Sequence, residues 1–291
     1  MPTSILVIGC GSIGERHIRC FQKTGQASVA ACDANPELLQ TLSERYQIPA
    51  YSDWKEALNK PSIEAVLIAT PAHLHVSMAR EVLQAGKHVF IEKPLSVTTD
   101  GVEELIQLRD SQKRVALVAY TYRSIPVTLA LKRYLDEEDF GPVKAITFDG
   151  GQHFPTFRPA YREIYYTDHA QGGGAIQDGL THLINTVEWL VGPIQSLYCD
   201  ATHQVLDGVE VEDTVNLAAR TTTALCNFSF NQFQAPNEIT LTLHAEKGSI
   251  RAEYHRNRWG HIALGANDWT WNDLPVGERD SLYSQQAEAY L

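Results

Sequence analysis

The sequence of 291 residues predicts an α/β protein with two domains, 1–122 and 123–291, because its hydrophobic pattern changes once along the chain. Up to residue 122, short apolar runs alternate with segments of helical periodicity, which is typical of a parallel sheet covered by helices. Beyond residue 123, long stretches alternate apolar and polar residues, as antiparallel strands do when one face is buried. The second domain is therefore expected to be α+β, with an open, mostly antiparallel sheet.

The elements follow from these patterns. Near-continuous apolar runs predict five buried strands in the first domain, at 4–10, 28–33, 64–70, 88–92 and 115–121. Helical periodicity predicts the helices between them, at about 12–25, 36–47, 72–85 and 98–113. In the second domain we expect helices at about 126–138 and 177–191, a polar aromatic loop at 150–174, and strands within 143–149, 195–206, 213–233 and 239–255.

Composition narrows the class of protein. The chain has 24 Lys and Arg against 35 Asp and Glu, a formal net charge of −11, which argues against nucleic acid or an anionic membrane surface as a partner. No apolar run approaches the roughly 20 residues of a membrane-spanning helix. The five cysteines lack CxxC spacing, so we expect reduced, buried thiols, a cytoplasmic location and no metal site.

A GxGxxG element connects the first predicted strand with the first predicted helix. Gly9 permits a tight turn, Gly11 lets the main chain approach a pyrophosphate, and Gly14 lets the helix pack closely on the sheet. The helix N-terminus, which begins at Ser12 and Ile13, presents unpaired N–H groups to the phosphates. This context predicts a Rossmann dinucleotide-binding domain, although glycines also serve ordinary turns.

The next strand ends in Asp33, 19 residues after Gly14. A carboxylate at this position accepts hydrogen bonds from ribose hydroxyls and repels a 2′-phosphate. No Arg or Lys occurs between Ala27 and Glu44, so the sequence favours NAD(H) over NADP(H) as the cofactor.

The ends of the next two strands supply further candidates. Thr70 and Pro71 end the strand at 64–70, and carboxyl ends of parallel strands are where ligands bind in open α/β sheets. His75, in the first turn of the following helix, is expected to serve as a structural or supporting residue rather than as a catalyst. Glu92 and Lys93 end the strand at 88–92, where the lysine points to the same crevice as the glycines and can donate to a substrate hydroxyl.

In the second domain, Asp178 and His182 follow a run of three glycines. Their i, i+4 spacing places both side chains on one face of a helix, where a carboxylate can support an imidazole as general base. The alternative is a buried hydrogen-bonded pair with a structural role.

Together these residues resemble the glucose–fructose oxidoreductase/inositol dehydrogenase family (Gfo/Idh/MocA). The resemblance rests on GCGSIGERH at 9–17, Asp33, Thr70-Pro71 with His75, AGKHVFIEKPLS at 85–96, Tyr122-Arg123 with Pro126, GPV at 141–143 and GGGAIQDGLTH at 172–182. It implies an NAD(H)-dependent oxidoreductase acting on a secondary alcohol of a sugar, polyol or related derivative, assembled as a homodimer or homotetramer.

The resemblance also implies roles for individual residues. Lys93, Asp178 and His182 would be catalytic, with His182 the proton acceptor, and the motif residues named above, including His75 and Glu92, would contact the cofactor. Arg123, Tyr161 and Arg162 would bind the substrate together with Asp178 and His182, and the stretch 157–162 resembles the substrate-lining loop of sugar-modifying members.

Two positions depart from the family pattern. Asn185 stands where many members have an acid, and residues 286–291 resemble the opening of a helix that members continue for tens of residues. Two other functions use the same residues: hydrolysis of glycosides through transient oxidation by bound NAD, and dinucleotide binding by a non-catalytic regulator. For His17 in the first helix, phosphate contact, packing and a surface role remain alternatives.

Overall fold

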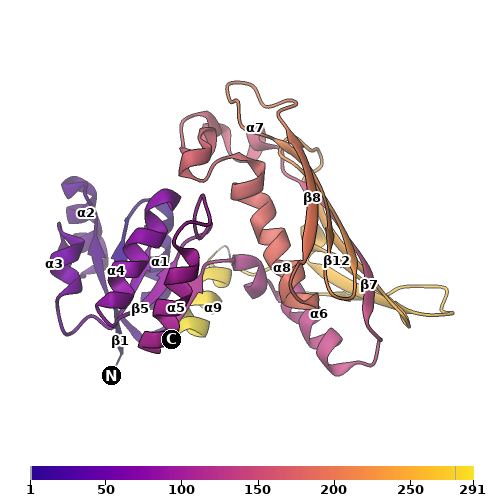
Figure 1. The fold of residues 1–291 in the computed structure, drawn as a ribbon, viewed down its shortest axis with the longest axis horizontal. Coiled ribbons are helices and arrows are strands. Elements are labelled where there is room, and N and C mark those ends of the chain that lie inside the picture. The colour runs from indigo at the N-terminus through magenta and orange to yellow at the C-terminus, as the bar shows by residue number, and fades with distance from the viewer. Residues whose placement is uncertain (1, 279) are drawn as a thin grey trace. The chain divides into compact units, whose positions relative to one another are not determined.

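The computed structural model describes residues 2–278 and 280–291, and the chain divides into two compact units (Figure 1). The first unit contains Met1–Thr121, Ala170–Gly172 and Glu278–Leu291, and the second contains Tyr122–His169 and Gly173–Gly277. The predicted fold class is confirmed: a parallel α/β sheet in one unit and a mostly antiparallel sheet in the other. The segment Glu278–Leu291 belongs to the first unit, whereas the sequence-based division placed it in the second.

The sheet of the first unit has the strand order β3-β2-β1-β4-β5-β6, and its strands are parallel. The strands are β1 (Thr3–Ile8), β2 (Ala27–Cys32), β3 (Ala50–Tyr51), β4 (Ala65–Ile68), β5 (His88–Ile91) and β6 (Ala116–Val118). This is the order of a doubly wound, dinucleotide-binding Rossmann fold, which reverses between β1 and β4. The sequence did not predict β3, because a strand of two residues carries no periodicity.

Helices cover both faces of this sheet, as its almost fully apolar strands require. They are α1 (Ser12–Lys23), α2 (Pro36–Tyr46), α3 (Trp54–Leu58), α4 (His75–Gln84), α5 (Val102–Gln112) and α9 (Ser281–Tyr290). One face packs on α4 through residues such as Val82 and Leu83, and the other packs on α1 through Ile18 and Phe21. Helix α9 lies against α1, and its Ala287 belongs to the same apolar cluster.

The sheet of the second unit has the order β14-β13-β12-β11-β7-β10-β9-β8, in which the pair β7 and β10 is parallel. Its strands are β7 (Val143–Gly151), β8 (Ser196–Thr202), β9 (Thr214–Arg220), β10 (Leu225–Asn231), β11 (Ile239–Ala245), β12 (Gly248–Glu253), β13 (Arg258–Ala263) and β14 (Thr270–Asp273). The stretches 213–233 and 239–255 therefore each hold two strands, because short turns interrupt their alternation.

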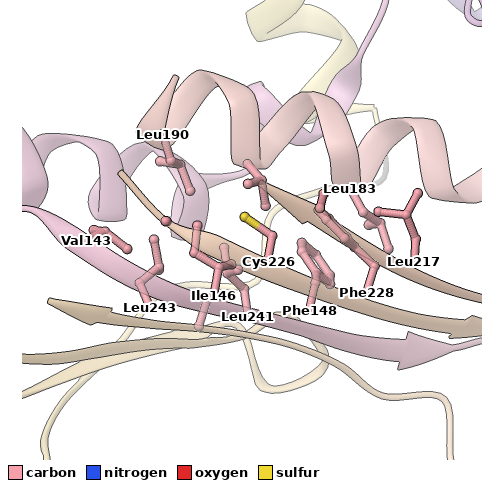
Figure 2. Packing of buried hydrophobic residues seen from close by; sticks show 14 of the residues in the cluster. Val143, Ile146, Phe148, Leu183, Leu190, Leu217, Cys226, Phe228, Leu241 and Leu243 are labelled. Atoms are coloured by element: carbon pink, nitrogen blue, oxygen red, sulfur yellow. The ribbon is translucent and has the colours of Figure 1, made fainter. Parts of the chain in front are cut away.

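Helices α6 (Pro126–Glu137) and α8 (Thr181–Val191) pack on one face of this sheet. Figure 2 shows the contact, in which Leu183 and Leu190 of α8 lie over Ile146, Phe148 and Phe228 of the strands. The opposite face carries the alternate, exposed residues of β7, β9 and β10. This alternation is what the sequence pattern predicted for antiparallel strands with one buried face.

The segment between β7 and α8 forms short helical turns instead of an open loop. It includes α7 (Phe154–Phe157), several 3₁₀ turns and a π-helical turn at Ile176–Leu180 that runs directly into α8. In the described residues, no helix is long and apolar enough to cross a membrane.

Candidate functional site

The turn between β1 and α1 is a cradle formed by three glycines. Gly9 has φ +84°, and a Cβ there would lie 2.6 Å from a main-chain oxygen at the end of β4. A Cβ at Gly14 would lie 1.9 Å from the carbonyl oxygen of Gly9, so only glycine allows α1 to begin this close to β1. A Cβ at Gly11 would meet nothing within 4 Å, which leaves open space before the helix N-terminus. The first-turn N–H groups of Ser12 and Ile13 can therefore face an anion.

A cavity of about 460 Å³ opens beside this turn, at the carboxyl ends of β1, β2 and β4. It is lined by Ile8, Gly9, Gly11, Cys32, Asp33, Ala34, Ser52, Trp54, Ala69, Thr70, Pro71, Leu74 and Met78. The cavity lies where the strand order reverses, which is the ligand-binding position of this fold. Its apolar and aromatic wall suits a nucleobase, and its glycine edge suits a pyrophosphate.

Asp33 is held in a fixed orientation at the wall of the cavity. Its Oδ2 accepts from the main-chain N–H of Cys10 at 2.6 Å, and its Oδ1 accepts from that of Asn35 at 2.8 Å. These bonds tie the carboxylate to the glycine turn and leave lone pairs for ribose hydroxyls. Burial raises the pKa of the Cys10 thiol to about 12, so this cysteine is not a nucleophile near neutral pH.

His75 joins the two loops that follow β4 and β5. Its Nε2 lies 2.8 Å from the carbonyl oxygen of Thr70, and its Nδ1 lies 2.9 Å from that of Pro94. The ring is buried at 1% exposure, whereas Thr70 and Pro71 line the cavity. This geometry gives His75 a supporting role, and its contact with a cofactor stays a prediction.

Glu92 and Lys93 follow β5, at the same carboxyl ends of the parallel strands as the glycine turn and Thr70. The Glu92 side chain is buried, with Oε1 2.6 Å from Nε2 of His17 and Oε2 accepting from the main-chain N–H of Lys93 at 3.0 Å. The Lys93 side chain is half-buried. For His17, packing and this hydrogen bond are thus observed, and the ring lies buried against Phe90.

In the second unit, Asp178 is buried at 4% exposure and held by two side chains. Its Oδ2 accepts from Nη1 of Arg158 at 3.0 Å, and its Oδ1 accepts from the Tyr165 hydroxyl at 2.5 Å. The nearby guanidinium favours the carboxylate form of Asp178. Sequence reasoning placed Arg158 in a stretch, 157–162, that resembles a substrate-lining loop, and it assigned no role to Tyr165. The only sequence feature that indicates a role for both residues is the aromatic, basic segment before the three glycines.

The sequence predicted that Asp178 and His182 lie on one regular α-helix, but in the structure they do not. Asp178 belongs to the π-helical turn and His182 to the first turn of α8. A π turn adds one residue to the hydrogen-bonded ring, so positions four apart are no longer related by the α-helical angle. Such turns often occur at functional sites.

Tyr122 packs beside the imidazole of His182, and the next residue, Arg123, is held by side chains of α8. The ring of Tyr122 lies 5.4 Å from the imidazole, and burial raises the pKa of the Tyr122 hydroxyl to about 12. Arg123 donates from Nε to Oδ1 of Asn185 at 2.7 Å, and its guanidinium lies 5.7 Å from the centre of the Trp189 ring. Asn185 therefore orients Arg123 without cancelling its charge.

Tyr161 and Arg162 occupy different surroundings from those expected of a substrate-lining loop. Tyr161 is 1% exposed and packs against Phe154 and Tyr166, and its hydroxyl donates to the carbonyl oxygen of Asp207 at 2.7 Å. Arg162 also donates to this oxygen, from Nε at 2.7 Å. Both side chains hold the segment between β8 and β9, so their binding of a substrate stays a prediction.

Known proteins share both the fold and the sequence pattern. Residues 3–120 match an oxidoreductase family with an NAD-binding Rossmann fold, GFO/IDH/MocA, and residues 128–251 match the GFO/IDH/MocA C-terminal domain. Levoglucosan dehydrogenase of Pseudarthrobacter phenanthrenivorans is 29% identical over 265 residues, which cover 81% of this chain and 67% of the relative. Inositol 2-dehydrogenase of Burkholderia lata is 30% identical over 197 residues, which cover 66% of this chain and 55% of the relative.

A solved structure of levoglucosan dehydrogenase in complex with NADH and levoglucosan has the same fold. It superposes with a TM-score of 0.89 at 22% sequence identity, covering 100% of this chain and 89% of the solved chain.

Proposed function

Because the chain belongs to the GFO/IDH/MocA family of oxidoreductases and carries its NAD-binding domain, we propose that it transfers hydride between NAD(H) and a secondary alcohol or ketone of a sugar, polyol or related derivative. The observation that supports this most is the glycine cradle with its adjoining cavity, which fits a dinucleotide in shape and charge. The substrate class rests on two relatives, which are named for levoglucosan and inositol.

We propose NAD(H) rather than NADP(H) as the cofactor. Asp33 presents an oriented carboxylate to the cavity, where it would accept from the ribose hydroxyls and repel a 2′-phosphate. The strand-to-helix connection that follows it carries no Arg or Lys up to Glu44.

The chain's own residues would bind the cofactor and the substrate, orient them and move a proton. The nicotinamide, when bound, would supply the carbon that exchanges hydride with the substrate. Lys93 would donate a hydrogen bond to the substrate oxygen, and His182 would accept the hydroxyl proton during oxidation. Asp178, kept charged by Arg158, would stabilise the imidazolium that His182 becomes.

The catalytic assignment is tested by Lys93→Ala and His182→Ala. We expect turnover with levoglucosan or inositol to fall by about 100-fold or more, as for lost acid–base catalysis, while the Kd for NADH stays within a few-fold. Lys144→Ala and His244→Ala, which change exposed residues of the second sheet, are the matched controls. Wild-type turnover in both Lys93→Ala and His182→Ala would overturn the assignment.

We further propose a cytoplasmic homodimer or homotetramer. The five cysteines are free thiols, which suits a reducing compartment; four are buried as predicted, whereas Cys199 is exposed. The open face of the second sheet exposes Tyr198 and Leu225, and such faces commonly serve as contacts between subunits.

A further inference from the structure

Glu92 is a buried carboxylate whose two oxygens have different partners. Oε1 faces Nε2 of His17 on α1, and Oε2 accepts from the main-chain N–H of Lys93. The main-chain N–H of Glu92 donates to the carbonyl oxygen of Ile68, so β5 keeps its pairing with β4 up to this residue. The carboxylate therefore connects α1 to the main chain of Lys93.

Burying the side chains of His17 and Glu92 together costs free energy that a purely structural contact would not require. His17 is fully buried, with its ring 5.3 Å from that of Phe90 and 5.6 Å from that of Tyr283. An apolar pair would fill such surroundings without the cost of removing a charge from water. Burial of this kind at the carboxyl ends of parallel strands, where ligands bind in open α/β sheets, is typical of functional positions.

The charge of Glu92 follows from its surroundings. Among the described residues, Nδ1 of His17 has no hydrogen-bond partner, so the hydrogen bond of this ring is the one that Nε2 makes with Glu92. Burial would raise the pKa of Glu92, but the hydrogen bond and the charge of His17, together with the charge and main-chain N–H of Lys93, hold it below its usual value. The Glu92 carboxylate thus places a negative charge beside Lys93.

We propose that Glu92, oriented by His17, is a positioning residue for Lys93. It fixes the main chain from which the lysine side chain departs, and its charge favours the ammonium form of that side chain. This inference rests on the proposed function, in which Lys93 donates a hydrogen bond to the substrate oxygen.

Other titratable and charged side chains surround the same turn. In the first unit they are His73 and His75 beside β4, Arg16 on α1, and Asp280 and Tyr283 at the start of α9. None of them would change in the substitutions below, so a shift in the pH profile would report on Glu92 and His17.

The principal test is Glu92→Gln, which keeps the side-chain shape and removes the charge. We expect kcat to fall by about 10- to 100-fold while the Kd for NADH stays within about threefold. We also expect the alkaline limb of the kcat/KM profile to move to lower pH by about one unit, because the ammonium loses its neighbouring charge. Exchange of the Lys93 amide proton, followed by NMR, should accelerate by about tenfold or more.

Glu64→Gln is the matched control. The Glu64 carboxylate also accepts from a main-chain N–H, that of Ser4 at 3.0 Å. It lies just before β4, at the amino ends of the strands of the same sheet and so far from Lys93. It should leave kcat, the pH profile and Lys93 amide exchange unchanged. His17→Gln, which keeps a side-chain donor toward Glu92, should give an intermediate loss, and it replaces Glu92→Gln if that variant does not fold.

Each result has one meaning. Wild-type kcat and an unshifted alkaline limb in Glu92→Gln, while Lys93→Ala loses turnover, would overturn the positioning role alone. Equal losses in Glu92→Gln and Glu64→Gln would also overturn it, because the effect would then be structural. Wild-type turnover in Lys93→Ala would instead overturn the catalytic assignment of the proposed function.

Discussion

His75 shows how one buried side chain can link two loops of the proposed cofactor site. Both of its ring nitrogens face main-chain carbonyl oxygens, of Thr70 and Pro94, which can only accept hydrogen bonds. A neutral imidazole donates one proton, so both contacts are hydrogen bonds only in the imidazolium form. Burial nevertheless outweighs the two carbonyls and lowers the pKa of His75 from its ordinary value of 6.5.

The direction of this shift predicts how stability depends on pH. Below about pH 6.5 the unfolded chain binds a proton at His75 more readily than the folded protein does, so the free energy of unfolding should fall as the pH decreases through this window. His75→Gln cannot titrate and should show a weaker dependence in urea titrations between pH 7 and 5. His153→Gln, at a half-buried position of the second unit, serves as control. Equal pH dependence in wild type and His75→Gln would contradict the prediction.

Asp33 should decide between the two nicotinamide cofactors. Asp33→Asn keeps an acceptor oxygen for the N–H of Asn35 or Cys10 and removes the charge that would repel a 2′-phosphate. We expect the ratio of the Kd values for NADPH and NADH, measured by fluorescence titration, to fall about tenfold or more, which corresponds to roughly 1.4 kcal/mol. Asp53→Asn, at the N-cap of α3, should leave the ratio unchanged. An unaltered ratio in Asp33→Asn would show that other groups set the preference.

At the scale of elements, the junction before α8 departs most from its sequence-based description. Periodicity predicted a regular helix from residue 177, but a π-helical turn occupies Ile176–Leu180. Glu212 holds its start, since its carbonyl oxygen accepts from the N–H of Ala175 and its Oε1 from that of Ile176. Gly179 lies so close to β10 that a Cβ there would be 2.5 Å from the Phe230 ring. These partners come from distant parts of the chain, the loop before β9 and strand β10, so local periodicity could not reveal the turn.

Gly179→Ala should therefore destabilise the protein, although alanine is the better helix former. Helix propensity alone would favour alanine by roughly 1 kcal/mol. The overlap with the Phe230 ring should reverse the sign and cost about 1–3 kcal/mol in the free energy of unfolding. In Gly179→Ala/Phe230→Leu, the smaller side chain should recover part of the loss beyond additivity. A stabilised Gly179→Ala protein in urea denaturation would show that the helix has room to move away.

The predictable part of the site consists of local motifs. Gly9, Gly14 and Asp33 could be placed from spacing alone, because a strand, a turn and a helix of fixed lengths bring them together. The partners of Asp178 could not, since Arg158 and Tyr165 lie 20 and 13 residues away in a segment of short turns without a repeating pattern.

At the scale of the whole molecule, the last helix illustrates a second limit of sequence reasoning. The hydrophobic pattern changes near residue 122, and residues 278–291 follow the strand-rich stretch without another change. In the structure α9 belongs to the first unit, where the Tyr290 ring packs edge-on against Phe90 and Asp280 pairs with Arg19. A return of the chain to an earlier domain depends on these distant contacts, and periodicity does not encode them.

The open face of the second sheet carries the prediction for assembly. All seven residues of β8 are exposed, and Tyr198 and Leu225 are 72% and 53% exposed, over a hollow of about 550 Å³ lined by residues of β7, β8, β9 and β10. The face mixes apolar with polar side chains such as Thr147, Asp149 and Asn227, as contact surfaces between subunits commonly do. We expect light scattering after size-exclusion chromatography to give the mass of a dimer or tetramer.

A charge placed on this face should break the assembly. Tyr198→Glu and Leu225→Asp should each lower the measured mass toward that of one chain, because a buried unpaired carboxylate is costly at an interface. Leu264→Asp introduces the same charge at an 83% exposed position beyond β13 and should not change the mass. A monomeric wild type, or variants of unchanged mass, would mean that this sheet face does not hold the subunits together.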